Sequence, residues 1–387
     1  MANEVVFYTN EDVGAPTLNN AAGSLIEVLY ACLVSGYNVQ TATSVSVSAG
    51  VATLALVGHG FVVGKMIELS GATPAGLNGR KVPLTVTSGT LTFDATGVAT
   101  GTATGTITVK RPGLGWTRPA NTGNVAIFAR SDVTATAQVL RVDDSGAGVA
   151  GPTYARATML ETWSDVNTFT GQAPMPAQLS GGQYWTKGGN STAAKQWVLV
   201  GDSKLFYLFT DNESYPFVSN VGLGGGGTFG DPVSYRAGDP YGAILGGGAS
   251  SAPLQTTFLP QNVGSTPPGP GLLVSRAFNQ LGGSVYAQPI GASDSVFGSR
   301  GPVYPSPVDN GALFAGQILV SEKHDALGNP VRGELPGLLM PLCRGVEVLH
   351  LNVLDGVPGA GRKTLIVAVN YYGQKGAVGI DVTGPWR

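Results

Sequence analysis

The stretch QWVLVGDSKLFYLFTD, residues 196–211, has the pattern of two β-strands joined by a tight turn. Apolar and aromatic residues fill both halves, and Gly201-Asp202-Ser203 supplies the residues that favour a turn. Trp197 and Phe206 are expected on the buried part of this hairpin. Short runs of the same strand-like character occur through most of the chain, so the sequence predicts a mainly β fold.

The composition favours the same fold class. The 387 residues include 58 Gly and 25 Pro, about a fifth of the chain, and both residues interrupt helices. We expect antiparallel sheets in β-sandwich or barrel-like domains, with one short N-terminal amphipathic helix and long Gly-rich loops. Only 12% of residues are charged, against about 25% in ordinary soluble domains. A surface so poor in charge is expected to be covered in substantial part by partners.

Charge and hydropathy bear on location and partners. A net charge of -2 does not provide the excess of positive charge that is typical of nucleic-acid-binding proteins, so no nucleic-acid partner is expected. The N-terminus MANEVVFYTNEDV lacks the features of a secretory signal, and no apolar run approaches the roughly 18 residues of a membrane span, so no membrane insertion is expected. A disulfide between Cys32 and Cys343 is possible, but two buried thiols made in a reducing cytoplasm fit better.

The chain divides into five predicted parts. Residues 1–40 form the helix-containing part of a main domain, and residues 41–110 form a small β module inserted into it. Residues 111–215 continue the main β domain, residues 216–310 form a Gly/Pro-rich loop region, and residues 311–387 form a C-terminal unit of strands.

The predicted helix lies in NNAAGSLIEVLYACLVSGYN, residues 19–38. Ser24 and Glu27 have the spacing of a capping box, and Gly36 offers a left-handed stop. The apolar residues between them form one stripe at helical spacing, which must lie on an apolar surface. This stripe consists of Leu25, Leu29, Cys32 and Leu33.

Residues 212–305 contain runs such as VGLGGGGTFGDP and GSTPPGPGLL, whose composition predicts little apolar burial. Six aromatic residues are interleaved with them, which a flexible linker would not need. We therefore expect long ordered loops that carry surface contacts completed by neighbouring subunits. The aromatic residues are Tyr215, Phe217, Phe229, Tyr235, Tyr241 and Phe258.

The C-terminal unit is predicted to contain the strands FAGQILVSEKHD, VEVLHLNVL (346–354) and TLIVAVNYY. GLLMPLCR is expected to be a buried connector between them, and GNPVRG (328–333) a turn. DGVPGAGRKT (355–364) resembles a phosphate-binding loop, with Gly356 and Gly361 at the required spacing. The Lys-Thr pair comes one position late, and a strand follows where a helix is needed, so we predict a hairpin loop.

Other chemical signals are weak. Gly222, Gly224 and Gly227 match G-x-G-x-x-G, but no helix pattern follows. Asp143-Asp144-Ser145-Gly146 lacks the spacing of a calcium loop and is predicted to be an acidic turn.

The three histidines have no zinc-ligand spacing. His59 and His350 are expected to be structural, and His324-Asp325 to be a solvated pair. No Gly-x-Ser-x-Gly motif is present, while paired carboxylates for glycoside cleavage depend on the fold. The sequence therefore predicts no catalytic, cofactor-binding or metal-binding residue, no cofactor and no enzyme.

Residues 58–109 resemble a small β module of bacteriophage structural proteins, which is similar to the FCCH domain of ubiquitin-activating enzymes. The resemblance implies a structural module without ubiquitin chemistry. The matching residues are His59, Gly60, Phe61, Val63, Gly64, Gly71, Ala72, Pro74, Asn78, Gly79, Phe93, Gly105, Thr106 and Ile107.

A second resemblance covers about half the chain together with the module. The opening FYTNEDVGAPTLNNAAGSLIEVLYACLVSGYNVQT resembles the start of a family of tailed-phage virion proteins. LRVDDSG (140–146) and LETWSDVNTFTGQAPMPAQLSGGQYW (160–185) are also similar to that family. The matching positions of the opening are Tyr8, Gly14, Ala15, Pro16, Leu18, Gly23 to Ile26 and Gly36 to Asn38.

This resemblance implies a non-enzymatic virion component made in the cytoplasm of a bacterial host, most simply part of the tail, tail tip or baseplate. Its expected partners are copies of itself and other virion proteins, with a host cell surface as a further candidate. Three alternatives stay open: a capsid decoration protein, a tail-borne glycan or cell-wall hydrolase, and a host receptor-binding protein.

Overall fold

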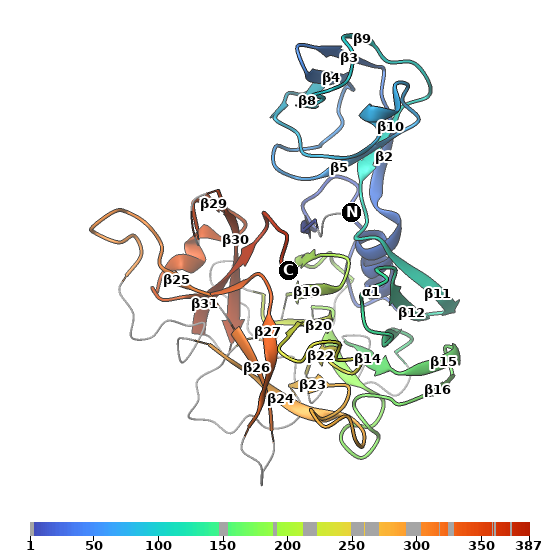
Figure 1. Ribbon diagram of the computed structural model, residues 1–387, viewed down its shortest axis with the longest axis vertical. Coiled ribbons are helices and arrows are strands. Elements are labelled where there is room, and N and C mark those ends of the chain that lie inside the picture. Colours follow the sequence, from blue (N-terminus) through green and yellow to red (C-terminus); the bar gives the residue numbers. More distant parts are fainter. Residues whose placement is uncertain are drawn as a thin grey trace.

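The computed structural model is mainly β, with 47% of residues in strands and 6% in helical segments, which confirms the predicted fold class. It contains several antiparallel sheets and one short helix near the N-terminus (Figure 1). The structure describes residues 4–146, 154–188, 192–211, 223–248, 259, 271–291, 303–316, 318–323, 329–357, 359, 361–371 and 374–387.

A ten-stranded sheet forms the centre of the body, and the opening hairpin is part of it. The predicted strands pair antiparallel, Gly201 lies opposite Phe206, and the Asp202 amide donates to the Leu205 carbonyl at 2.9 Å. Trp197 and Phe206 are buried, as predicted. In spatial order the strands are β1 (Val6–Thr9), β18 (Trp197–Gly201), β19 (Leu205–Thr210), β20 (Gly225–Gly230), β22 (Ile244–Gly246), β23 (Leu272–Val274), β24 (Val285–Ile290), β26 (Ile318–Glu322), β27 (Val331–Leu335) and β21 (Val233–Ser234).

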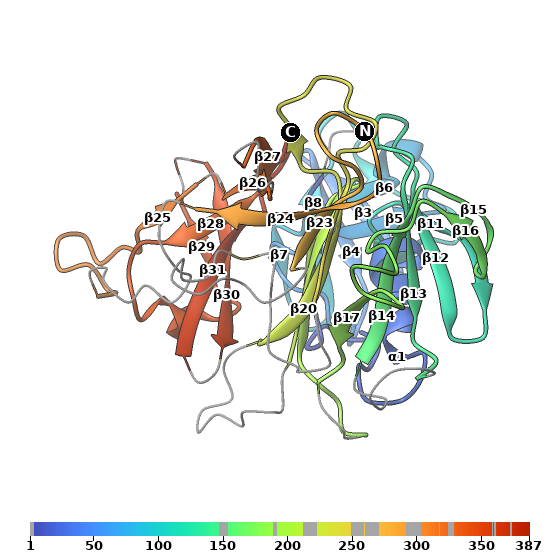
Figure 2. The same ribbon diagram turned by 90° about the horizontal axis from the view of Figure 1, so that it is seen from below.

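Two further sheets cover the faces of the central sheet, so that the body has three layers (Figure 2). Leu199 and Phe206 belong to the core that includes the helix and the first covering sheet, whereas Val200 and Tyr207 belong to the core on the opposite face. Burial on both faces explains why strands β18 and β19 are apolar at nearly every position. The first covering sheet contains β11 (Trp116–Thr122), β12 (Val125–Arg130), β13 (Val139–Asp143), β14 (Tyr154–Leu160) and β17 (Gln183–Thr186). Beside it lies the hairpin of β15 (Thr162–Asp165) and β16 (Thr168–Thr170). The second covering sheet contains β25 (Phe314–Ala315), β28 (Leu338–Pro341), β31 (Gln374–Asp381), β30 (Lys363–Tyr371) and β29 (Val353–Asp355).

Helix α1 (Ser24–Leu29) continues as a π-helical segment (Tyr30–Ser35), and the predicted apolar stripe is fully buried. The predicted capping box is wrong. The N-cap is Gly23, and the Ser24 hydroxyl donates to the Asn19 carbonyl at 2.7 Å. The Leu25 amide donates instead to the carboxylate of Asp144, which is distant in the sequence.

Gly36 ends this helical segment, as predicted, with a φ of 71°. A Cβ atom at this position would lie 2.1 Å from the carbonyl oxygen of Arg111. Both the backbone conformation and the close approach therefore require glycine.

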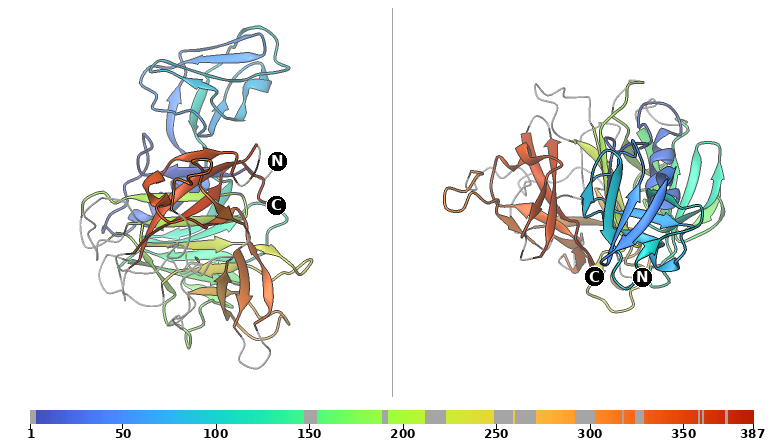
Figure 3. Two further views of the ribbon diagram at one scale, coloured as in Figure 1. Left: turned by 90° about the vertical axis from the view of Figure 1, so that its left-hand side faces the viewer. Right: turned by 90° about the horizontal axis from the view of Figure 1, so that it is seen from above.

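Residues 37–111 form two small sheets that enclose a hydrophobic core of their own. They project from one end of the body (Figures 1 and 3). We call this unit the projecting module. The division of the chain into five parts remains a prediction. Its strands are β2 (Tyr37–Thr41), β10 (Thr108–Arg111), β5 (Ile67–Ser70) and β6 (Gly79–Lys81) in one sheet, and β7 (Thr85–Val86), β8 (Thr90–Asp94), β4 (Val51–Ala55), β3 (Ser44–Ser48) and β9 (Gly101–Thr102) in the other, with a 3₁₀ turn at Ala75–Leu77.

The Gly-rich region differs from the prediction of loops with little burial. Two of its described parts, residues 223–248 and 271–291, contribute strands β20 to β24, and Phe229 is fully buried. Tyr235 is exposed and Tyr241 is partly buried. The predicted contact residues Tyr215, Phe217 and Phe258 lie outside the described residues.

Three predictions for the C-terminal part were wrong. Residues 346–354 are not one strand, because Val346–Leu349 forms a 3₁₀ turn and only Val353–Asp355 is extended. Positive φ angles at Gly345 and Leu351 interrupt the extended backbone. The predicted connector GLLMPLCR is buried as expected at Leu338–Pro341, but these residues form strand β28, and the described part of the predicted turn, residues 329–333, contains the start of strand β27.

Candidate functional site

The stretch that resembles a phosphate-binding loop is a hairpin connection, as predicted. Strands β29 and β30 pair antiparallel, with Asp355 opposite Lys363. The Lys363 ammonium lies 3.6 Å from the Asp355 carboxylate, and both side chains are largely exposed. Arg362 donates to the Gly384 carbonyl at 3.1 Å. A strand, rather than a helix N-terminus, follows the glycines.

The second glycine motif runs into the start of strand β20, where only Gly227 of its three glycines lies. Gly222 is outside the described residues, but Gly227 is buried against the indole ring of Trp185. A Cβ atom on Gly227 would lie 2.1 Å from that ring, and a Cβ on Gly225 would lie 1.7 Å from the Thr186 hydroxyl. These glycines allow close packing between the central sheet and strand β17.

The described histidines make hydrogen bonds within the fold, and both cysteines are buried. His350 accepts a hydrogen bond from the Ala368 amide at 3.0 Å, and burial lowers the pKa of its imidazole. Cys32 and Cys343 are buried free thiols, as predicted, and burial raises the pKa of Cys32. His324 lies outside the described residues. Within the described ranges, no three His, Cys, Asp or Glu side chains converge as metal ligands.

The acidic sequence at 143–146 makes a turn, as predicted, with Asp143 accepting hydrogen bonds from the Ser145 amide and hydroxyl. Asp144 has a further role that the sequence did not indicate. Its carboxylate is fully buried, accepts from the Leu25 amide at 2.9 Å and pairs with the Lys187 ammonium at 2.6 Å. Burial raises the pKa of Asp144, while Lys187 opposes that rise. This ion pair joins the start of helix α1 to the first covering sheet.

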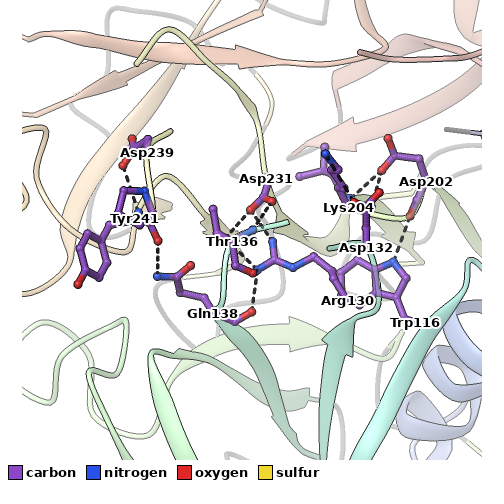
Figure 4. A network of polar contacts seen from close by, with 12 residues as sticks. Trp116, Arg130, Asp132, Thr136, Gln138, Asp202, Lys204, Asp231, Asp239 and Tyr241 are labelled. Atoms are coloured by element: carbon purple, nitrogen blue, oxygen red, sulfur yellow. Dashed lines mark hydrogen bonds and ion pairs between the residues drawn. The ribbon is translucent and has the colours of Figure 1, made fainter. Parts of the chain in front are cut away.

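A buried arginine connects the first covering sheet to the central sheet (Figure 4). The Arg130 guanidinium donates to Asp231 at 2.6 Å and to the carbonyls of Thr136 and Gln138 at 2.9 and 2.7 Å. Burial lowers the pKa of Arg130, and the Asp231 carboxylate acts in the opposite direction. Arg387, at the end of the chain, donates to the Asp231 carbonyl at 2.7 Å. The network therefore joins the first covering sheet, the end of strand β20 and the C-terminal segment that follows strand β31.

A second part of the network fixes the turn of the β18–β19 hairpin (Figure 4). Asp202 accepts from the Lys204 amide at 2.8 Å, and its carbonyl accepts from the Trp116 indole at 3.1 Å. Asp132 accepts hydrogen bonds from Ser203 and Thr134. Burial raises the pKa of Asp132, but these hydrogen bonds outweigh it and hold the pKa at about 2.

The junction between the projecting module and the body contains the third ionic cluster. Asp12 accepts from the Tyr37 hydroxyl at 2.6 Å and from the Lys65 ammonium, and Arg111 lies 3.7 Å from the same carboxylate. Arg111 also donates to the Phe7 carbonyl in strand β1 at 2.6 Å. Burial raises the pKa of Asp12, but the two cations outweigh it and lower the pKa overall. We call these four charged and phenolic side chains, Asp12, Tyr37, Lys65 and Arg111, the junction cluster.

Beside the junction cluster, the loop 57–64 places its aromatic rings inside and its valines outside. His59 and Phe61 are buried and stacked with 5.6 Å between ring centroids. His59 accepts from the Phe61 amide through Nδ1 at 2.9 Å, so its protonated Nε2 donates to the Thr87 carbonyl at 3.0 Å. The exposed fractions of the outward side chains are 84% for Val57, 47% for Val62 and 58% for Val63. We call these three residues the valine loop.

The sequence predicted His59 as structural and did not indicate the junction cluster. Its members lie at positions 12, 37, 65 and 111, too far apart for any local spacing rule. The sequence feature that best indicates such a cluster is the small number of charged residues. A charged side chain that becomes buried must pair with another polar or charged group.

Comparison with known proteins adds no relative: no protein-family model matches this chain, and no curated protein gives a significant match. Among the described residues, no helix is long and apolar enough to cross a membrane.

Proposed function

We propose that this chain is a non-enzymatic structural component of a tailed-phage virion that acts by assembling with copies of itself and with other virion proteins. The tail, tail tip or baseplate is the proposed position. The observation that carries the proposal is the projecting module, a small β unit with its own core that stands out from a three-layered body (Figure 1).

Two features support a role for the module as a rigid arm. Strands β2 and β10 connect it to the body, and the junction cluster ties both strands to residues of the N-terminal segment. The valine loop also presents apolar side chains on a backbone that is fixed by the buried His59 and Phe61. An ordered apolar surface loses less conformational entropy on association than a flexible one.

The first test is assembly of the purified full chain, measured by light scattering and negative-stain microscopy over a range of concentrations. We expect defined oligomers, and we expect Val62→Ser with Val63→Ser to weaken their association. Val133→Ser is the matched control, because Val133 is 97% exposed on the body and lies outside the valine loop.

The second test separates the proposal from the enzymatic alternative. The chain is incubated with host polysaccharide and peptidoglycan, and soluble fragments are measured. A monomer at all concentrations that releases fragments would contradict the proposed function. Labelled antibodies against the chain, applied to intact particles, distinguish the tail from the capsid.

A further inference from the structure

The chain contains two Asn-Gly pairs, Asn78-Gly79 and Asn310-Gly311, in very different surroundings. Asn-Gly is the dipeptide most prone to intramolecular cyclisation, because glycine has no side chain to obstruct attack by its backbone nitrogen on the asparagine amide. The two pairs share the reacting dipeptide, so we look to the fold for a difference in their reactivity.

The amide of Asn78 is held at both ends. Its Oδ1 accepts from the Ala72 amide at 2.8 Å, and its Nδ2 donates to the Ala72 carbonyl at 2.8 Å. Gly79 begins strand β6 and pairs with Leu69 of strand β5. Cyclisation would break both side-chain hydrogen bonds and remove Gly79 from its ladder position.

Asn310 has neither restraint. It is exposed at a turn with a φ of 57°, and among the described residues its side-chain amide makes no hydrogen bond. The Asn310 backbone amide donates to the Ser306 carbonyl at 2.8 Å, and the Ser306 amide donates to the Gly311 carbonyl at 3.1 Å. The Gly311 amide donates to the Asp309 carboxylate at 2.9 Å. That carboxylate therefore contacts the proton that must leave before Gly311 can attack.

We propose that Asn310-Gly311 is a site of spontaneous deamidation and that Asn78-Gly79 is protected by the fold of the projecting module. The Gly311 nitrogen loses its proton and bonds to Cγ of Asn310, while the Cγ–Nδ2 bond breaks and ammonia leaves with that proton. Water then opens the cyclic imide at either carbonyl and gives aspartate or iso-aspartate. Water is the only co-reactant, and no electrons are transferred.

Deamidation of Asn310 would change the charge of an exposed turn. Val308, two residues earlier, is 92% exposed, and Asp309 already supplies one negative charge. Deamidation adds a second carboxylate, and the iso-aspartate product also lengthens the backbone by one carbon. The exposed turn at 306–311 would thus become more acidic as the protein ages.

The test is peptide mapping by mass spectrometry after incubation of the native full chain at neutral and mildly alkaline pH, with iso-aspartate detected separately. We expect conversion at Asn310 to exceed conversion at Asn78 at least about ten-fold, which corresponds to about 1.4 kcal/mol in the barrier. Conversion should accelerate with pH, because the attacking nitrogen must be deprotonated. Equal conversion at the two sites, or no conversion at Asn310, would overturn the proposal.

Two controls separate the role of the fold from that of the dipeptide. In denaturant, the two sites should convert at similar rates; continued protection of Asn78 there would show that the fold is not its cause. Gly311→Ala should slow conversion at Asn310, because its added Cβ obstructs the attack; this Cβ would lie 3.1 Å from the Asp309 carboxylate, whose side chain must shift slightly. Unchanged conversion in this variant would exclude the cyclic imide route.

Discussion

Strand β20 and the β29–β30 connection are both rich in glycine and both resemble nucleotide-binding motifs, yet they occupy opposite environments. Strand β20 lies in the middle of the central sheet and is buried at all six positions. The connection between strands β29 and β30 is at the surface, and a Cβ atom added at Gly356, Gly359 or Gly361 would have no neighbour within 4 Å among the described residues. Close packing requires glycine at Gly225 and Gly227 in the first region, whereas a positive φ favours it at Gly356 and Gly361 in the second.

The largest expected effect comes from filling the contact between strand β20 and Trp185. Gly227→Ala places a methyl group 2.1 Å from a fully buried indole that donates to the Gly246 carbonyl. We expect a loss of about 3 kcal/mol or more in the free energy of unfolding. Chemical denaturation measures it, and a loss below about 1 kcal/mol would contradict this packing.

A double-mutant cycle sharpens the assignment to Trp185. Trp185→Leu alone should destabilise the protein by removing buried ring atoms. In the Trp185→Leu background, Gly227→Ala should lower the free energy of unfolding by at least about 1 kcal/mol less than it does in the wild type, because the added methyl group then has room. Additive effects would show that the clash lies with other atoms.

Smaller effects are expected in the β29–β30 connection. Gly361 has a φ of 76°, so Gly361→Ala should cost about 1 kcal/mol through backbone strain alone. Gly359 has no positive φ and, in the described part of the chain, no close neighbour, so Gly359→Ala should change stability by less than about 0.5 kcal/mol. Thermal unfolding of the pair compares the two directly. If both variants lose equal stability, backbone conformation is not the distinguishing cause.

The smallest effect concerns Lys363, the residue that a phosphate site would need. Its exposed pairing with Asp355 should contribute less than about 0.5 kcal/mol, as for most surface ion pairs. Lys363→Ala should therefore leave the melting temperature nearly unchanged. Magnesium and ATP should not raise the melting temperature of the wild type; a rise that disappears in Lys363→Ala would restore the nucleotide-binding hypothesis.

Local sequence patterns predicted part of the fold well. The alternating runs and turn residues indicated the β class, the β18–β19 hairpin and the β29–β30 connection, because strand pairing across a short turn depends on nearby residues. The apolar stripe of helix α1 was also predictable from its spacing. By contrast, the pattern at 346–354 alternates like a strand, and only the positive φ angles at Gly345 and Leu351 reveal that it folds differently.

The candidate site was much less predictable. The junction cluster joins residues from four separate segments, and no local signal marks Asp12 or Arg111 as partners. The same holds for Asp144, which caps helix α1 in place of the predicted Ser24. Such contacts depend on which distant side chains the layers bring together.

The sequence by itself determined that this chain builds antiparallel sheets, because apolar alternation and turn chemistry act over a few residues. The tertiary structure decided what each glycine and each charge does. Gly227 accommodates a ring that comes from another sheet, and the few buried ions take the partners that the layers place beside them, since an unpaired buried charge is too costly to persist.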